Sequence, residues 1–402
     1  MIKSQVALIR CDTYDEGEVY EAVRKGLELI GGVSHFVSSE ESIVLKPNVL
    51  FGTNPENCVC THPSVFKAVG KILREVGVNV LYGDSSAFGA CKANMKRAGL
   101  KQAADEIGIE LADFDHGRVV VHGEAMLNKR FVIANGVLDT DGLISLPKLK
   151  THEFTTYTGA IKNQYGCIPG ALKNQQHARF RSPQDFATML VDLNMIVRPR
   201  FYVMDAIMAM EGNGPRSGNP RKLGVLLLSS DPVALDAVAC RIINLDTALV
   251  PTFEPGEKSG LGTYREDCIE IIGAKVEEFV CSDFDVVRKR RVSTPGPETK
   301  TGKGIKSKIR GWISSLVKKQ VCQRPIIDNT KCTLCGTCIK YCPVVPKAVN
   351  WHQHKESRPP VHDYSLCIRC FCCQEYCPEG AISVGEPLLG RFFIWLYSVL
   401  RR

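Results

Sequence analysis

Short apolar runs alternate with longer amphipathic stretches along residues 1–285. Residues 5–10, 42–46 and 78–82 are short, mostly apolar runs followed by polar or glycine-containing segments, which is typical of buried strands. In residues 16–29 and 62–76 the apolar positions recur every three or four residues, and this spacing predicts amphipathic helices. The same patterns predict further strands at 119–122, 130–134, 143–146, 201–204 and 225–228, and further helices at 155–164, 183–197 and 232–243.

The alternation of strands and helices predicts an α/β domain over residues 1–285, with an open, mostly parallel sheet and helices on both faces. After this domain we expect a basic linker with an amphipathic helix at 286–321 and a small α+β domain at 322–386. An apolar and basic helix is expected at 387–402. A chain of 402 residues has room for two or three such units.

The net charge of +8 is concentrated in residues 286–321, which hold eleven Lys or Arg residues and one Glu. The rest of the chain is therefore slightly acidic in sum. Because the basicity belongs to the linker and not to a face of the large domain, no nucleic-acid partner is expected.

Two segments near the C-terminus combine apolar and basic residues. Within 306–321 the apolar residues follow helical spacing, with Lys and Arg opposite, and 388–402 holds nine mostly apolar residues between arginines. Nine residues cannot span a bilayer, which needs about 20. We interpret both segments as packing against a neighbouring domain. The alternative is contact with a membrane surface or an acidic protein.

Eight cysteines form one motif written twice, Cys332-x2-Cys335-x2-Cys338-x3-Cys342-Pro and Cys367-x2-Cys370-x2-Cys373-x3-Cys377-Pro. This is the spacing of bacterial ferredoxins that hold two [4Fe–4S] clusters, in which the fourth cysteine of each run binds the other cluster. The motif predicts one cluster on Cys332, Cys335, Cys338 and Cys377, and a second on Cys342, Cys367, Cys370 and Cys373.

Zinc and disulfides are the alternatives for these cysteines. Zinc sites usually use two separated C-x2-C pairs, which fits the triple spacing poorly. Nothing at the N-terminus resembles a signal peptide, so we expect a cytoplasmic protein with reduced thiols. The alternative is a peripheral position at the membrane surface. Cys372 is surplus to the motif and is interpreted as a packed thiol beside the ligands.

Polar side chains in the large domain cluster where strands are expected to end, the usual place for ligands in open α/β sheets. Three lysines and a histidine within fifteen residues make an electropositive pocket for a carboxylate or phosphate plausible, and the histidine is an acid/base candidate. The alternative is a solvated surface. The candidate catalytic residues are His152, Lys148, Lys150 and Lys162, and the candidate binding residues are Lys46, Asn48, Asp84, Ser85, Asn163 and Asp205.

Six motifs in a fixed order resemble the DUF362 family: VLKPNVL, THP, YGDSS, LPKLKTHEFTTYTGAIKNQYGCIPG, MDAIMAMEGNGPRSG and SSDPVALDAVACRII. Members with this arrangement carry a C-terminal two-cluster ferredoxin domain. The resemblance implies an iron–sulfur protein of anaerobic metabolism without naming a substrate. By looser analogy of fold, the large domain is similar to the nickel-pincer lactate racemase superfamily, which binds small carboxylates.

Three functions follow from these features. The first is an oxidoreductase that passes electrons through two clusters to a small anionic substrate in the α/β domain. The second is an electron carrier or assembly factor without enzymatic activity, whose basic segments contact an acidic redox partner or a membrane. The third is a racemase or isomerase in which the clusters are structural or sensing.

Overall fold

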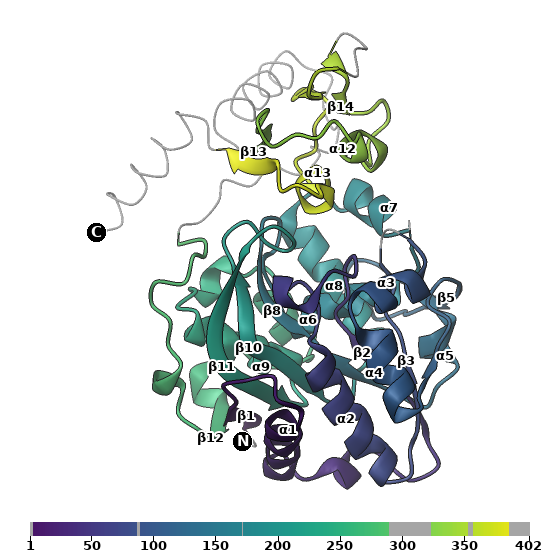
Figure 1. The fold of residues 1–402 in the computed structure, drawn as a ribbon, viewed down its shortest axis with the longest axis vertical. Helices are drawn as coiled ribbons and strands as arrows, with labels where there is room; N and C mark the ends of the chain where they lie inside the picture. The colour runs from purple at the N-terminus through teal and green to yellow at the C-terminus, as the bar shows by residue number, and fades with distance from the viewer. Residues whose placement is uncertain (1–2, 87–88, 171, 289–322, 353–356, 386–402) are drawn as a thin grey trace. The chain divides into compact units, whose positions relative to one another are not determined.

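The structure is a computed structural model that describes residues 3–86, 89–170, 172–288, 323–352 and 357–385 (Figure 1). The predicted helices at 306–321 and 387–402 lie outside these residues. The described chain forms two compact units. The first runs through Lys173 and resumes at Ala187–Val286, and the second combines Asn174–Phe186 with the described residues after Val286.

The first unit is built on a ten-stranded sheet with the order β12-β1-β11-β10-β7-β2-β3-β4, in which β8 pairs with β10 and β9. The strands are β1 (Ser4–Arg10), β2 (Ser42–Pro47), β3 (Asn79–Tyr82), β4 (Glu110–Leu111), β7 (Gly142–Leu146), β8 (Lys148–His152), β9 (Thr156–Thr158), β10 (Tyr202–Glu211), β11 (Asn219–Ser229) and β12 (Ile269–Gly273). A separate hairpin pairs β5 (Gly117–Val121) with β6 (Arg130–Ala134).

Most strand pairs in this sheet are parallel, as the sequence predicts. β2 lies parallel to both β3 and β7, and β10 lies parallel to β7 and β8. The exceptions are β11, which is antiparallel to both of its neighbours, β1 and β10, and β9, which is antiparallel to β8. The carboxyl ends of β2, β3 and β7 therefore meet at one edge of the sheet.

Helices cover both faces of the sheet, and the strands bury alternate side chains against them. Ala7 and Ile9 of β1 belong to the core that includes residues of α1 and α2, whereas Val6 and Leu8 are buried toward the opposite face. The helices of this unit are α1 (Glu16–Leu29), α2 (Pro63–Glu75), α3 (Cys91–Arg97), α4 (Leu100–Ile107), α5 (Asn135–Leu138), α6 (Ala160–Asn163), α8 (Pro183–Val197), α9 (Pro232–Ile242) and α10 (Phe253–Lys258), whereas α7 (Leu172–Arg179) lies mostly in the second unit. The boundary between the units falls within α7 and α8.

Three local predictions are wrong. Residues 148–152, which the sequence places in a polar segment after a strand, form a further strand, β8, directly after β7, and all five are buried. Asp205 does not end a strand, because β10 continues to Glu211. The helix predicted at 155–164 is the short strand β9 followed by α6. Each of these strands contains buried polar residues whose partners are distant in the sequence. A prediction from the hydrophobic pattern assigns buried strands to apolar residues and therefore misses them.

The second unit is small and mixes strands with short helices. β13 (Arg324–Ile327) pairs antiparallel with β16 (Ile382–Gly385), and β14 (Val349–Asn350) pairs with β15 (Val361–His362). Helices α12 (Thr337–Lys340) and α13 (Cys372–Tyr376) begin within the two cysteine runs and contact each other. Near the end of α13, Tyr376 donates a hydrogen bond of 2.9 Å to Asn174 Oδ1, which ties segment 174–186 into this unit.

No helix within the described ranges is long and apolar enough to cross a membrane.

Candidate functional site

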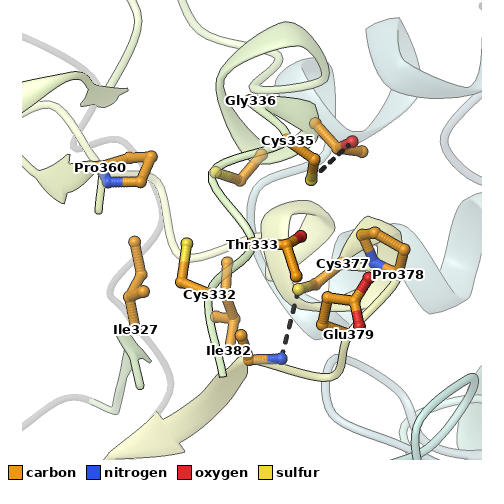
Figure 2. Close-up of a pocket in the computed structure, with 13 residues that line it drawn as sticks. Ile327, Cys332, Thr333, Cys335, Gly336, Pro360, Cys377, Pro378, Glu379 and Ile382 are labelled. Carbon is orange, nitrogen blue, oxygen red and sulfur yellow. Dashed lines mark hydrogen bonds between the residues drawn. The ribbon is translucent and has the colours of Figure 1, made fainter. Parts of the chain in front are cut away.

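Four cysteines from the two motif runs line one pocket of the second unit. Cys332, Cys335 and Cys338 come from the first run, and Cys377 comes from the end of the second (Figure 2). Apolar side chains, among them Ile327 and Ile382, complete the lining. The structure thus brings together the four residues that the sequence assigns to one cluster.

The backbone curls in the same way in both cysteine runs. In the first run, Leu334 and Gly336 have φ of 60° and 67°, and at the equivalent positions of the second run Arg369 and Phe371 have φ of 57° and 59°. Left-handed residues are uncommon outside glycine. Their recurrence at matching positions reverses the chain between successive cysteines and turns the thiols toward a common centre.

The remaining four motif cysteines form a second, more buried group. Cys342, Cys367, Cys370 and Cys373 are all buried, whereas Cys335 of the first group is exposed. Burial raises the pKa of the Cys373 thiol well above its usual value, and the neighbouring thiols Cys370 and Cys367 raise it further.

Hydrogen-bond donors point at the sulfur atoms, which here stand in for cluster-bound thiolates. The backbone N–H of Ala381 donates to Cys377 Sγ over 3.3 Å, and that of Arg369 donates to Cys367 Sγ over 3.4 Å. Donors of this kind stabilise negative charge on sulfur. Two groups of four thiols, each with such donors, fit [4Fe–4S] clusters.

The described residues hold no group of three His, Cys, Asp or Glu side chains close enough to bind a single metal ion. That finding concerns one ion, whereas in a cubane cluster each of the four thiolates binds a different iron atom. Beside the second group, Cys372 forms a side-chain hydrogen bond with Cys370, and this bond is the largest cause of a lowered Cys370 pKa. Cys372 therefore packs against a ligand position.

In the first unit, Lys148 and Asp205 form an ion pair of 2.8 Å that is almost fully excluded from solvent. Tyr14, from the loop after β1, donates to Asp205 Oδ1 over 2.8 Å and accepts from Lys148 Nζ over 2.9 Å. The backbone N–H of His62 donates to the other carboxylate oxygen, and the His62 ring stacks on Tyr14 at 3.6 Å. The carboxylate of Asp205 is thus surrounded by donors.

A second buried ion pair joins Lys46 at the end of β2 to Asp84 after β3, with 2.7 Å between Nζ and Oδ1. Asn163 Oδ1 accepts from Lys46 Nζ over 3.3 Å, and Asp84 Oδ2 accepts from the backbone N–H of Val49. Only glycine fits at position 166, because an added Cβ would overlap Asp84 Oδ1 and come within 2.7 Å of Lys46 Nζ. This part of the site is closely packed.

Two other predicted lysines of this unit, Lys150 and Lys162, have the following contacts. Lys150 Nζ donates to Asn48 Oδ1 and to the Val59 carbonyl, each over 2.7 Å. Lys162 Nζ lies 5.8 Å from the centre of the Tyr165 ring.

Two further predicted residues hydrogen-bond the backbone. His152 Nδ1 accepts from the backbone N–H groups of Phe154 and Thr155, which places the ring proton on Nε2. Ser85 Oγ accepts from the Gly170 N–H. Both contacts order local backbone.

Sequence reasoning missed three residues of these clusters. Tyr14 and His62 contact Asp205 from loops that precede helices, and Lys173 is buried with its Nζ bonded to the Ile168 carbonyl. Burial lowers the pKa of Lys173 to about 7, with Lys46 lowering it further and Asp84 opposing the shift. Tyr14 follows the end of a predicted strand, and this position could have marked it as a candidate site residue.

The stability of the first unit should fall as the pH is lowered through the titration of His62. Burial, helped by nearby Lys148, lowers the pKa of His62 from 6.5 to about 4, while Asp205 opposes the shift. The folded state therefore binds this proton less readily than the unfolded chain. The contribution of His62 to the free energy of unfolding is complete above pH 6.5 and is lost as the pH falls toward 4. The loss amounts to about 2 kcal/mol after allowing for the partial exposure of the ring.

His62→Asn tests this expectation, because asparagine can still accept the Ser64 N–H that His62 Nδ1 now accepts at the start of α2. Denaturant unfolding between pH 4 and 7 should give a shallower loss of stability for the variant than for the wild type. His116→Asn, at an exposed position, is the matched control. Parallel pH curves for wild type and His62→Asn would contradict the assignment.

Comparison with known proteins gives two family matches and one curated relative. The model described as "Domain of unknown function (DUF362)" matches residues 43–241, and the model described as "4Fe-4S dicluster domain" matches residues 324–378. The "Thylakoid-associated protein sll1697" of Synechocystis sp. is 36% identical over 262 residues, which cover 65% of this chain and 81% of the relative.

Two solved structures are similar over part of their length. The lactate racemase apoprotein from Thermoanaerobacterium thermosaccharolyticum has a TM-score of 0.39 and 11% identity, covering 60% of this chain and 56% of that chain. A crystal structure of a protein from Thermotoga maritima has a TM-score of 0.33 and 14% identity, covering 54% of this chain and 56% of that chain. The chain thus spans a little over half the length of each of these structures.

Proposed function

The chain belongs to the DUF362 family and carries a 4Fe-4S dicluster domain, and from this premise we propose that it transfers electrons through two [4Fe–4S] clusters. The observation that carries the proposal is the pocket shared by Cys332, Cys335, Cys338 and Cys377. A fourth ligand contributed by the other run is the mark of the two-cluster ferredoxin arrangement. The clusters supply one-electron chemistry, and the protein supplies thiolates, donors to sulfur and burial.

The proposal is tested on protein purified without oxygen. Two clusters require about eight iron and eight sulfide atoms per chain. Dithionite should reduce the protein, and the EPR spectrum should show two reduced clusters that interact magnetically. Iron for a single cluster, or clusters that dithionite and stronger reductants leave oxidised, would contradict electron transfer through a pair.

The electrons are proposed to reach a small anionic substrate in the first unit, which would make the protein an oxidoreductase. Lys46 and Lys148 already neutralise carboxylates. The proposal therefore assigns anion binding to the other two lysines, Lys150, whose Nζ donates to Asn48 Oδ1, and Lys162, whose Nζ lies near the Tyr165 ring. His152 at the end of β8 is the proposed acid/base group, because Nδ1 is held by backbone N–H groups and Nε2 is the nitrogen that would exchange a proton with the substrate.

Thermal stabilisation by small carboxylates and phosphate tests this assignment on the intact holoprotein. A ligand that stabilises the wild type should lose its effect in Lys150→Met and in Lys162→Met. The exposed Lys129→Met is the matched control. Equal stabilisation of all variants would reject the pocket and would favour the alternative, an electron carrier that acts on a redox partner protein.

Peripheral association with a membrane is proposed because the similar Synechocystis protein is described as thylakoid-associated. Sedimentation of the full chain with vesicles of anionic lipid tests it. Vesicles of neutral lipid serve as the control, and equal sedimentation with and without vesicles would contradict it.

A further inference from the structure

One histidine of the second unit contacts a predicted cluster ligand. His362, on β15, places Nε2 at 3.4 Å from Cys373 Sγ. Its ring stacks on Tyr364, with 5.8 Å between ring centres and an angle of 9° between the planes. Tyr364 is itself held by a hydrogen bond of 2.9 Å from its hydroxyl to the Pro325 carbonyl. The ring of His362 is therefore oriented by its neighbours.

The two cysteine groups differ at this point. No histidine is among the described residues that line the pocket of Cys332, Cys335, Cys338 and Cys377. That group also includes the exposed Cys335, whereas the four cysteines of the His362 group are all buried. The cysteine motif is repeated, but the residues around the two cysteine groups differ.

We propose that His362 sets the reduction potential of the cluster held by Cys342, Cys367, Cys370 and Cys373, by donating a hydrogen bond from Nε2 to the Cys373 sulfur. The inference rests on the proposed function, since it needs two clusters. A cluster gains one negative charge when it takes up an electron, and a donor to its sulfur stabilises that charge. His362 keeps its proton throughout, and the electron comes from the reductant.

The consequence is a pair of clusters with different potentials. The donor raises the potential of the buried cluster relative to the same cluster without His362. The cluster bound by the exposed Cys335 exchanges electrons with solution more directly, because its thiolate reaches the surface. His362 is a positioning residue in this scheme, and it does not touch a substrate.

The experiment is a redox titration of the anaerobic holoprotein, followed by EPR, for the wild type, His362→Phe and His362→Gln. Phenylalanine keeps the stacking on Tyr364 and removes the donor, whereas glutamine can restore an N–H near the same place. In His362→Phe, the ratio of reduced to oxidised cluster at fixed potential should fall about tenfold for one cluster, which is a shift of ~59 mV for a one-electron couple. The other cluster should not shift, and His362→Gln should recover at least half of the change.

Each outcome separates this inference from the proposed function. If the wild type contains less iron than two clusters require, the proposed function is wrong. Two clusters whose potentials are the same in all three proteins, or that shift equally in His362→Phe, overturn the role of His362. Loss of a cluster in His362→Phe but not in His362→Gln would assign the histidine to cluster retention and would overturn tuning. His116→Phe, at an exposed position, controls for the substitution itself.

Discussion

Replacing Cys377 by serine should remove the cluster of the first cysteine run and leave the cluster of its own run intact. The reason is geometric, because Cys377 lines the pocket with Cys332, Cys335 and Cys338 (Figure 2). Cys377→Ser should therefore halve the iron content of the anaerobic protein, and the EPR spectrum should lose the features that come from interaction between two clusters. Cys342→Ser should halve the iron as well, by removing the other cluster.

Double variants decide between the crossed assignment and the simpler one in which each run binds its own cluster. If Cys332 and Cys377 serve one cluster, the variant that lacks both keeps about half of the iron, while the variant that lacks Cys342 and Cys377 keeps almost none. The simpler assignment predicts that the variant lacking Cys332 and Cys342 keeps half of the iron, and this result would contradict the crossed arrangement.

Cys372→Ser is the matched control for both series, because Cys372 neighbours a ligand on α13 but hydrogen-bonds Cys370 instead of lining the pocket. Its iron content should equal that of the wild type. A loss of iron in this variant would show that serine substitutions in this segment act through folding, and the double variants would then be compared with Cys372→Ser in place of the wild type.

The sequence predicts the strands that bury ordinary apolar runs. Strands β2, β3 and β7 fall where residues 42–46, 78–82 and 143–146 are apolar. Strand β8 was missed because two of its five buried residues are lysines. Burial of a lysine depends on a partner, and the partner of Lys148 is Asp205 on another strand. Because the two residues of this ion pair are far apart in the sequence, the local hydrophobic pattern does not reveal it.

The iron–sulfur domain was predictable because the spacing of its cysteine motif is local, and the 4Fe-4S dicluster match confirms this domain. The membership of the DUF362 family is likewise confirmed. His362 and Tyr14 were not predictable in the same way. Each reaches its partner from a different segment, and only the fold places His362 beside Cys373 and Tyr14 beside Asp205.

Lys148→Met should destabilise the first unit strongly, by about 3–5 kcal/mol, because it leaves the buried carboxylate of Asp205 without its cation. Adding Asp205→Asn should restore part of this loss. The amide can still accept from the His62 N–H and can donate to the Tyr14 hydroxyl, so neither group loses its partner. Thermal unfolding of the anaerobic holoprotein, followed by circular dichroism, measures both variants against the wild type.

The exposed ion pair of Arg118 and Asp139 gives the matched control, since both side chains are more than half exposed. Arg118→Met should cost at most about 1 kcal/mol, because solvent screens the pair. A loss as small as this for Lys148→Met would show that the Lys148 amine does not serve the structure through Asp205. Lys148 would then be available to an anionic substrate. This result would favour the catalytic role predicted for Lys148, against which the buried ion pair with Asp205 argues.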